Sequence, residues 1–326
     1  MTDNELEELE RIHLIAIKPH LKELSERKSY KGLGRLLIMV FVYLTVLLLA
    51  IKFDSIYTWI FADVLLGLLF SGLFSVMHYC GHGTLLASRK LNRILGTLFS
   101  MPILMNFSLY KFFHFVHHQR TSQLGDTEPK GELNSFPSYF LALSNLDFIY
   151  GFFRLSIASL FNYRSFFIKN RKQLNHVKLD TIFLLGWIVF IAFVTFYYPK
   201  FSLMGYWLPL QIGLSFNFYT SFAEHYECSL SKNKLSNTRT VYLKSRILKY
   251  FLFNSNYHAE HHFLPSVPPW NLPKVNFYIK ESLQHTQKSY YQIHKEQLKK
   301  IVNRQQRPAE TNDGFVKNFN FKLEKL

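Results

Sequence analysis

The stretch "YTWIFADVLLGLLFSGLFSVMHYCGH", residues 57–82, joins the two signals that decide the fold. Its first part, Tyr57–Met77, is apolar and long enough to cross a bilayer, which takes about 20 residues. Its end places His78 and His82 four positions apart, so a helix would carry both imidazoles on one face. The stretch therefore predicts a membrane span that ends in a pair of side chains able to bind a metal.

Three more stretches are apolar enough to cross a bilayer, namely Leu36–Ile51, Ile182–Tyr198 and Met204–Phe222. Only a few residues join the first span to the second and the third to the fourth, which predicts two transmembrane hairpins. Two shorter or polar-interrupted stretches, Leu95–Asn106 and Tyr139–Phe161, fit interfacial or re-entrant helices better. The sequence predicts an all-α integral membrane protein with four transmembrane helices.

The basic residues are distributed in a way that predicts the orientation of these spans. Of the 38 Lys and Arg, 7 lie in residues 1–35, 12 in residues 79–181 and 17 after residue 222, whereas only Lys52 and Lys200 lie in the short turns. An even number of spans puts the three basic regions on one side, which the positive-inside rule makes cytoplasmic. Both termini are then expected in the cytoplasm. The same pattern accounts for the net charge of +16 without a nucleic-acid partner, for which no binding motif is recognised.

The composition also predicts how the chain divides. We expect a cytosolic N-terminal segment at 1–34, a membrane domain at 35–275 and a basic cytosolic tail at 276–326. The end of that tail, residues 305–326, has the composition of a disordered segment. With only two cysteines no disulfide framework is expected, and the charged first 35 residues do not look like a cleavable signal peptide.

Histidines gather in three boxes and at one further position. Nine of the 14 histidines lie at or beyond the cytoplasmic end of a predicted span: His78, His82, His114, His117, His118, His225, His258, His261 and His262. The spacings HxxxH, HxxHH and HxxHH put the imidazoles of each box on one helix face. A lone HxxxH often only solvates a helix, but three boxes on one predicted side favour a metal site. Nine imidazoles suit two ions of Zn, Cu, Fe or Ni.

His225 is a weaker candidate than the box histidines. Alone it is more often a structural or surface residue, but it immediately follows the fourth predicted span, where it could reach the site as a ninth ligand.

The boxes and their surroundings resemble the membrane fatty acid desaturase and hydroxylase superfamily, the histidine-box enzymes with a non-haem diiron centre. The resemblance rests on "HYCGHGT" (78–84), "FHFVHHQRTSQLGDTEP" (113–129) and "NYHAEHHFLPSVPPWNLPKV" (256–275), and covers roughly residues 35–275. It is greatest to bacterial fatty acid desaturases. Tyr79 stands where relatives often have an acid, and "GDTEP" replaces a common "DPE".

The resemblance implies a stem of four transmembrane helices with a cytosolic helical cap that holds two irons. It implies that the eight box histidines are catalytic iron ligands and that His225 is the additional one. The implied activity is an oxidoreductase that uses O2 to introduce a double bond into an acyl chain carried by a lipid or a thioester. Electrons would come from ferredoxin, or from cytochrome b5 with its reductase. A lipid or carotenoid hydroxylase or ketolase of the same superfamily is the alternative, because the boxes fix the oxidant and leave the product open.

A non-catalytic metal-binding membrane protein is the alternative from another class. A metal transporter should place its ligands at mid-span, whereas only Asp63 is charged within a predicted span. Among the acids near the boxes, Asp126, Glu128 and Glu224 are expected to be solvated charges. Glu260 lies between ligands, and we expect it to support the cofactor by orienting a ligand imidazole. Arg239 is expected to be either a phosphate contact or a plain surface charge.

Overall fold

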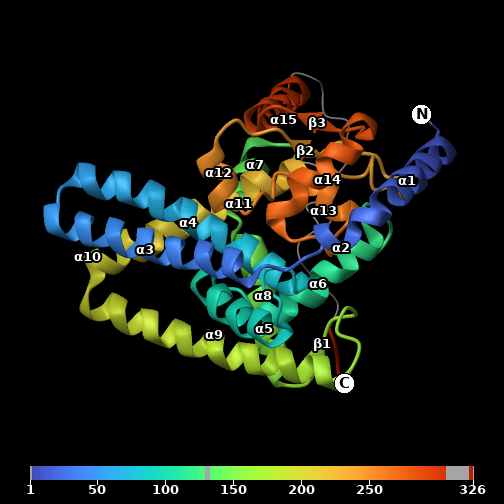
Figure 1. The fold of residues 1–326 in the computed structure, drawn as a ribbon. Helices are drawn as coiled ribbons and strands as arrows, with labels where there is room; N and C mark the ends of the chain where they lie inside the picture. Colours follow the sequence, from blue (N-terminus) through green and yellow to red (C-terminus); the bar gives the residue numbers. More distant parts are fainter. Residues whose placement is uncertain (1, 129–132, 306–322, 326) are drawn as a thin grey trace. The chain divides into compact units, whose positions relative to one another are not determined.

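The computed structural model describes residues 2–128, 133–305 and 323–325. The described chain is mostly helical, as expected, with two pairs of two-residue strands (Figure 1). Strand β1 (Tyr163–Arg164) pairs antiparallel with β4 (Glu324–Lys325), and β2 (Thr240–Val241) pairs parallel with β3 (Thr286–Gln287). The disorder expected at 305–326 falls almost wholly outside the described residues.

The chain divides into two compact units, and each is described by itself. The span unit comprises residues 27–112, 144–217 and 319–326, and the histidine unit comprises residues 1–26, 113–143 and 218–318. The bounds of the units fall within the helices α6 (Phe107–Arg120), α7 (Phe136–Ser144) and α11 (Leu208–His225).

The span unit holds the long apolar helices. Apart from its parts of α6, α7 and α11, the helices of this unit are α3 (Ser29–Phe53), α4 (Ile56–His82), α5 (Arg89–Ser100), η2 (Met101–Ile103), α8 (Leu146–Leu160), α9 (Arg171–Tyr197), α10 (Pro199–Ser202) and the π-helix η3 (Leu203–Trp207). Among the described residues, α3, α4 and α9 are each long and apolar enough to cross a membrane, and a fourth is reached only if α7 and α8 count as one span. The fourth span expected from sequence instead falls on η3 and α11, where the π-helix interrupts the regular hydrogen bonding.

The hairpin of α3 and α4 follows from its local sequence. Asp54 ends α3 in the left-handed region, and Ser55 caps α4 by accepting a hydrogen bond from the Thr58 N–H. Such a cap satisfies backbone groups that the helix cannot pair internally. The two helices lie side by side (Figure 1). At Gly67 of α4 an added Cβ would lie 2.7 Å from the Cβ of Ile212, so only glycine permits this close approach to α11.

A buried ionic network fixes the beginning of α6, the helix of the second histidine box. Both oxygens of Asp180 accept hydrogen bonds from the Arg93 guanidinium at 2.7 Å, and one of them also accepts the Ser108 N–H at 2.8 Å. Asp180 is buried, so the charge is paired in a fork geometry rather than solvated. The network therefore orients the first turn of α6 within the span unit.

The histidine unit is built from short helices. They are α1 (Asp3–Ile17), η1 (Lys18–His20), α2 (Leu21–Leu24), α12 (Arg246–Phe251), α13 (His258–Phe263), η4 (Pro269–Asn271), α14 (Leu272–Ile279), η5 (Lys280–Ser282) and α15 (Tyr290–Gln305). Residues of α15 enter its core: Tyr290 and Ile293 pack with Ala223 and Val241. The described part of the expected C-terminal tail thus contributes to the unit that carries most of the histidines.

Candidate metal centre

The second box lies in the last turns of α6. His114 and His117 are buried there, and the spacing of three and four residues puts both on the same helix face as His118. The chain then turns through Gly125, whose φ of +85° suits glycine, and brings Asp126 back to His117. The turn is therefore part of the site and not only a connection.

The third box forms α13, a helix of only six residues that is buried throughout. Three of those residues are histidines and a fourth is Glu260. Polar side chains at such depth are costly unless they are paired or bind a metal. The composition of α13 is therefore explained by a site and not by packing.

Four histidines of the histidine unit form the tighter group. His117, His225, His258 and His262 each offer a ring nitrogen, and these four atoms all lie within 4.8 Å of one another. The Nε2 atom of His225 lies 3.2 Å from that of His117 and 3.0 Å from that of His258. The four residues come from α6, α11 and α13, which brings together residues up to 145 positions apart in the sequence (262 less 117).

The hydrogen bonds of the Nδ1 atoms, which point away from the other imidazoles of this group, fix the tautomers of His117 and His225. The Nδ1 of His117 lies 2.8 Å from a carboxylate oxygen of Asp126, and the Nδ1 of His225 lies 3.1 Å from the carbonyl oxygen of Asn237. Carboxylate and carbonyl oxygens only accept, so both Nδ1 atoms must donate. In a neutral imidazole the Nε2 atom then carries a lone pair.

The same reasoning applies to His262. The Thr121 hydroxyl donates to the carbonyl of His117 at 2.8 Å, so its oxygen is left to accept from the His262 Nδ1 at 3.3 Å. The His262 Nε2 is buried, and among the described residues it has no hydrogen-bond partner. Burial, followed by the charges of nearby histidines, lowers the pKa of His262 well below its usual value, which favours the neutral form that binds metals.

Lone pairs that face one another at about 3 Å cannot hydrogen-bond, and a cation between them resolves the conflict. The donor set of neutral imidazoles suits Fe, Zn, Cu or Ni. The residues present therefore fit a transition-metal ion at this group.

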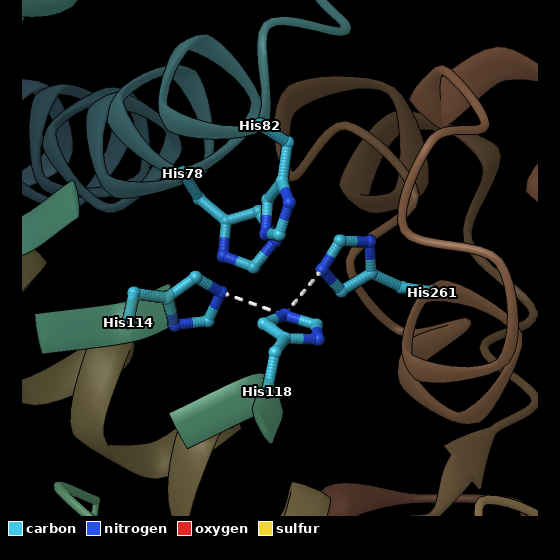
Figure 2. Close-up of side chains that lie close together, drawn as sticks. All are labelled: His78, His82, His114, His118 and His261. Atoms are coloured by element: carbon cyan, nitrogen blue, oxygen red, sulfur yellow. Dashed lines mark hydrogen bonds between the residues drawn. The ribbon is translucent and has the colours of Figure 1, made fainter. Parts of the chain in front are cut away.

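A second group in the histidine unit contains three histidines (Figure 2). The Nε2 of His118 lies 2.9 Å from that of His114 and 3.1 Å from that of His261. His114 also directs its Nδ1 outward, to an oxygen of Glu128 at 2.9 Å. Figure 2 also labels His78 and His82, which belong to the span unit.

The first box closes α4 in the span unit. The rings of His78 and His82 lie on one side of the helix with their centroids 5.0 Å apart, as the spacing predicts. The Nδ1 of His78 lies 3.3 Å from the Tyr110 hydroxyl, within the same unit. Tyr110 has no counterpart among the residues expected from sequence.

The acids behave differently from what the sequence suggested. We expected Asp126, Glu128 and Glu224 to be solvated, but Asp126 and Glu128 bind His117 and His114, and Glu224 lies 3.5 Å from the Nδ1 of His258. These expectations are wrong because the loop after α6 and the end of α11 fold back on the imidazoles.

Glu260 is buried, but its two oxygens accept hydrogen bonds from Thr240 and Asn276 and not from the imidazoles beside it. That Glu260 supports the cofactor stays a prediction. It would act indirectly, because its oxygens bond to Thr240 and Asn276 and not to a ligand imidazole. Burial raises the pKa of Glu260 to about 7, although the hydrogen bonds from Thr240 and Asn276 act to lower it.

Glu128 is shifted the other way. Burial alone would raise its pKa, but the charge of His117 and the hydrogen bond from His114 outweigh burial and lower the pKa of Glu128 to about 2. The lowered pKa favours the ionised carboxylate, which accepts the His114 Nδ1–H.

Known proteins are similar to this chain over the part that carries the nine histidines. The family model described as "Fatty acid desaturase" matches residues 54–294. The chain is 28% identical over 288 residues to an omega-6 fatty acid desaturase, chloroplastic, of Arabidopsis thaliana, covering 80% of this chain and 62% of that relative. It is 23% identical over 248 residues to an sn-1 acyl-lipid omega-3 desaturase (ferredoxin) of a Nostoc species, covering 68% of each. A relative from Glycine max, also an omega-6 desaturase, is 26% identical over 82% of this chain and 66% of its own length.

Proposed function

Because the chain belongs to the fatty acid desaturase family, we propose that it uses O2 to introduce a double bond into a fatty acyl chain, at a centre of two irons held by its histidines. The observation that carries the proposal is the meeting of the Nε2 atoms of His117, His225, His258 and His262 in one buried group. Imidazoles with inward lone pairs are a ligand set, and no packing role explains them.

The ligand count supports a second ion. The first group supplies four imidazoles, whereas the second supplies only His114, His118 and His261 from the histidine unit. An ion of this kind takes about four to six ligands, so the second group needs more. We propose His78 and His82 as further iron ligands, because their rings lie on one side of α4 and the HxxxH spacing resembles the first box of the family.

The overall reaction converts –CH2–CH2– and O2, with two electrons and two protons, into –CH=CH– and two waters. A bound two-iron centre supplies the activation of O2 for removal of hydrogen from an unactivated carbon. The protein's own residues hold the ligands: Asp126, Glu128 and the Asn237 carbonyl accept the Nδ1–H groups of His117, His114 and His225. This fixes each imidazole in the tautomer that binds metal.

The substrate, donor and membrane placement are part of the proposal. The helices α3, α4 and α9 support an integral membrane protein, and the basic loops support a cytoplasmic location for both termini and the boxes. The name of the Nostoc relative includes ferredoxin, which supports a ferredoxin as the source of electrons, with cytochrome b5 as the other source to test. An acyl-lipid substrate is supported in the same way.

The test is expression in a host that lacks the activity, followed by mass spectrometry of total fatty acids. We expect a product two mass units lighter than its precursor, with the double bond at one position. His261→Ala should abolish the product, whereas His20→Ala, which changes an exposed histidine of η1, should leave it unchanged. A hydroxylated or ketonic product would replace this proposal with the hydroxylase alternative. A full yield from His261→Ala would overturn the assignment of the histidines.

A further inference from the structure

A buried segment of four residues, Asn237–Thr240, lies beside the histidine groups. Asn237, Thr238 and Thr240 are all fully or almost fully buried, although the segment is mostly irregular. Buried polar residues outside regular structure need partners. Asn237 and Thr238 donate side-chain hydrogen bonds to the preceding loop, whereas the Asn237 carbonyl, Arg239 and Thr240 bond to elements that carry the site. We call these four residues the linking segment.

Asn237 and Arg239 of the linking segment form hydrogen bonds with the C-terminal end of α11. The Arg239 N–H donates to the carbonyl of Glu224 and the Arg239 guanidinium donates to the carbonyl of Ala223, both at 2.8 Å. The last carbonyls of a helix have no partner within it, and a cation there also complements the helix dipole. The carbonyl of Asn237 accepts the Nδ1–H of His225, the last residue of α11.

Thr240, the last residue of the linking segment, contacts the third box. The Thr240 hydroxyl donates to Glu260 at 2.6 Å, inside α13. Thr240 also forms an antiparallel bridge with Tyr257, the residue before His258. The next residue, Val241, donates its N–H to the carbonyl of Asn256 at 2.9 Å. One short segment thus contacts α11 and α13, two of the three elements whose histidines form the first metal group.

We propose that the linking segment positions His225 relative to the third box, with Arg239 and Thr240 as its positioning residues. The inference rests on the proposed function, since it concerns the same ions. Arg239 is then neither a phosphate contact nor a plain surface charge, the two roles considered from sequence. Hydrogen bonds to one segment that is three peptide bonds long then help to set the separation between His225 and His258, whose rings also contact each other directly.

The first experiment uses Thr240, where a conservative pair of variants separates the hydroxyl from the shape. Thr240→Val keeps the size and removes the hydroxyl, whereas Thr240→Ser keeps the hydroxyl. Binding of Co2+ to the purified full chain in detergent, followed by its visible absorption band, reports affinity and ligand geometry without turnover. We expect Thr240→Val to bind about tenfold or more weakly with a shifted band, as residues behind metal ligands do when changed. Thr240→Ser should bind like the wild type.

The matched control is Thr286→Val. Thr286 is the register partner of Thr240 on β3 but its side chain is exposed, so this variant should bind Co2+ with unchanged affinity. The second experiment compares Arg239→Gln with Arg246→Gln, since Arg246 is exposed at the start of α12. We expect only Arg239→Gln to weaken binding, by roughly fivefold or more.

The outcomes separate this inference from the proposed function. Wild-type affinity and an unchanged band in both Thr240→Val and Arg239→Gln would overturn the inference while leaving the metal centre intact. A wild-type chain that binds no Co2+ would overturn both. Should Thr240→Val fail to fold, as judged by the melting temperature of the metal-free protein, the two arginine variants decide the question.

Discussion

The Nε2 atoms of His225 and His258 lie 3.0 Å apart, while the Nδ1 of His225 faces the carbonyl oxygen of Asn237. His225 must therefore donate outward and offer a lone pair inward. His225 thus directs a lone pair at the Nε2 atom of His258, as it would when both rings bind one cation. This relationship joins α11 to α13.

Asp126→Asn should weaken metal binding by about 10- to 100-fold. The Asn amide can donate as well as accept, so it no longer fixes His117 with its proton on Nδ1. The measurement is the affinity for Fe2+ or Co2+ of the purified protein without oxygen. The control is Asp3→Asn in the exposed first turn of α1, and equal affinities of the two variants would contradict the prediction.

Metal should stabilise the histidine unit strongly. An ion that binds only the folded protein adds about 2.7 kcal/mol when its concentration is 100 times the dissociation constant. We therefore expect a chelator to lower the melting temperature by several degrees and added Fe2+ to restore it. The same treatment of a His117→Ala/His262→Ala double variant should have much less effect. A chelator that shifts the wild type and the double variant equally would speak against the site.

Asp180→Ala should destabilise the protein by roughly 3 kcal/mol or more, because it leaves the Arg93 guanidinium without its buried partner and removes the acceptor for the Ser108 N–H. Chemical unfolding in mild detergent measures the change. Glu8→Ala removes an exposed pair with Arg11 within α1 and should cost no more than about 1 kcal/mol. Similar costs for the two variants would show that the buried network contributes little.

Gly67→Ala should cost about 1–3 kcal/mol, since the added methyl group would overlap the side chain of Ile212. Gly34→Ala provides the matched comparison on α3, where an added Cβ meets nothing within 4 Å. That second change should be neutral, or stabilising by up to about 1 kcal/mol, because alanine favours helix. Thermal unfolding of both proteins side by side checks the difference, and a harmless Gly67→Ala would mean that α4 and α11 can separate at that point.

Much of the candidate site was predictable from sequence because it obeys helical periodicity. The spacing within "HFVHH" already puts His114, His117 and His118 on one face, and α6 confirms that face. Three of the four expected spans likewise coincide with long apolar helices. The fourth did not, because periodicity and hydropathy do not detect the π-helix at Leu203–Trp207.

The residues behind the ligands were not predictable in the same way. Asp126 reaches His117 through a turn, and Thr240 reaches Glu260 from a different part of the chain, so neither follows a helical repeat. The sequence carried one usable signal, the glycine of "LGDTEP", which permits the turn that returns Asp126 to the box. Contacts of this kind depend on tertiary folding and not on local spacing.

The depth of α13 has a consequence for how the proposed metal centre would be filled. His258, His261 and His262 are all at least nine-tenths buried, so an ion in the first group cannot leave without local opening of the helix. Residence is then governed by the rate of that opening and not by the equilibrium ranking of divalent ions, in which copper and zinc exceed iron. We therefore expect the metal that is available while the chain folds to determine which metal is bound.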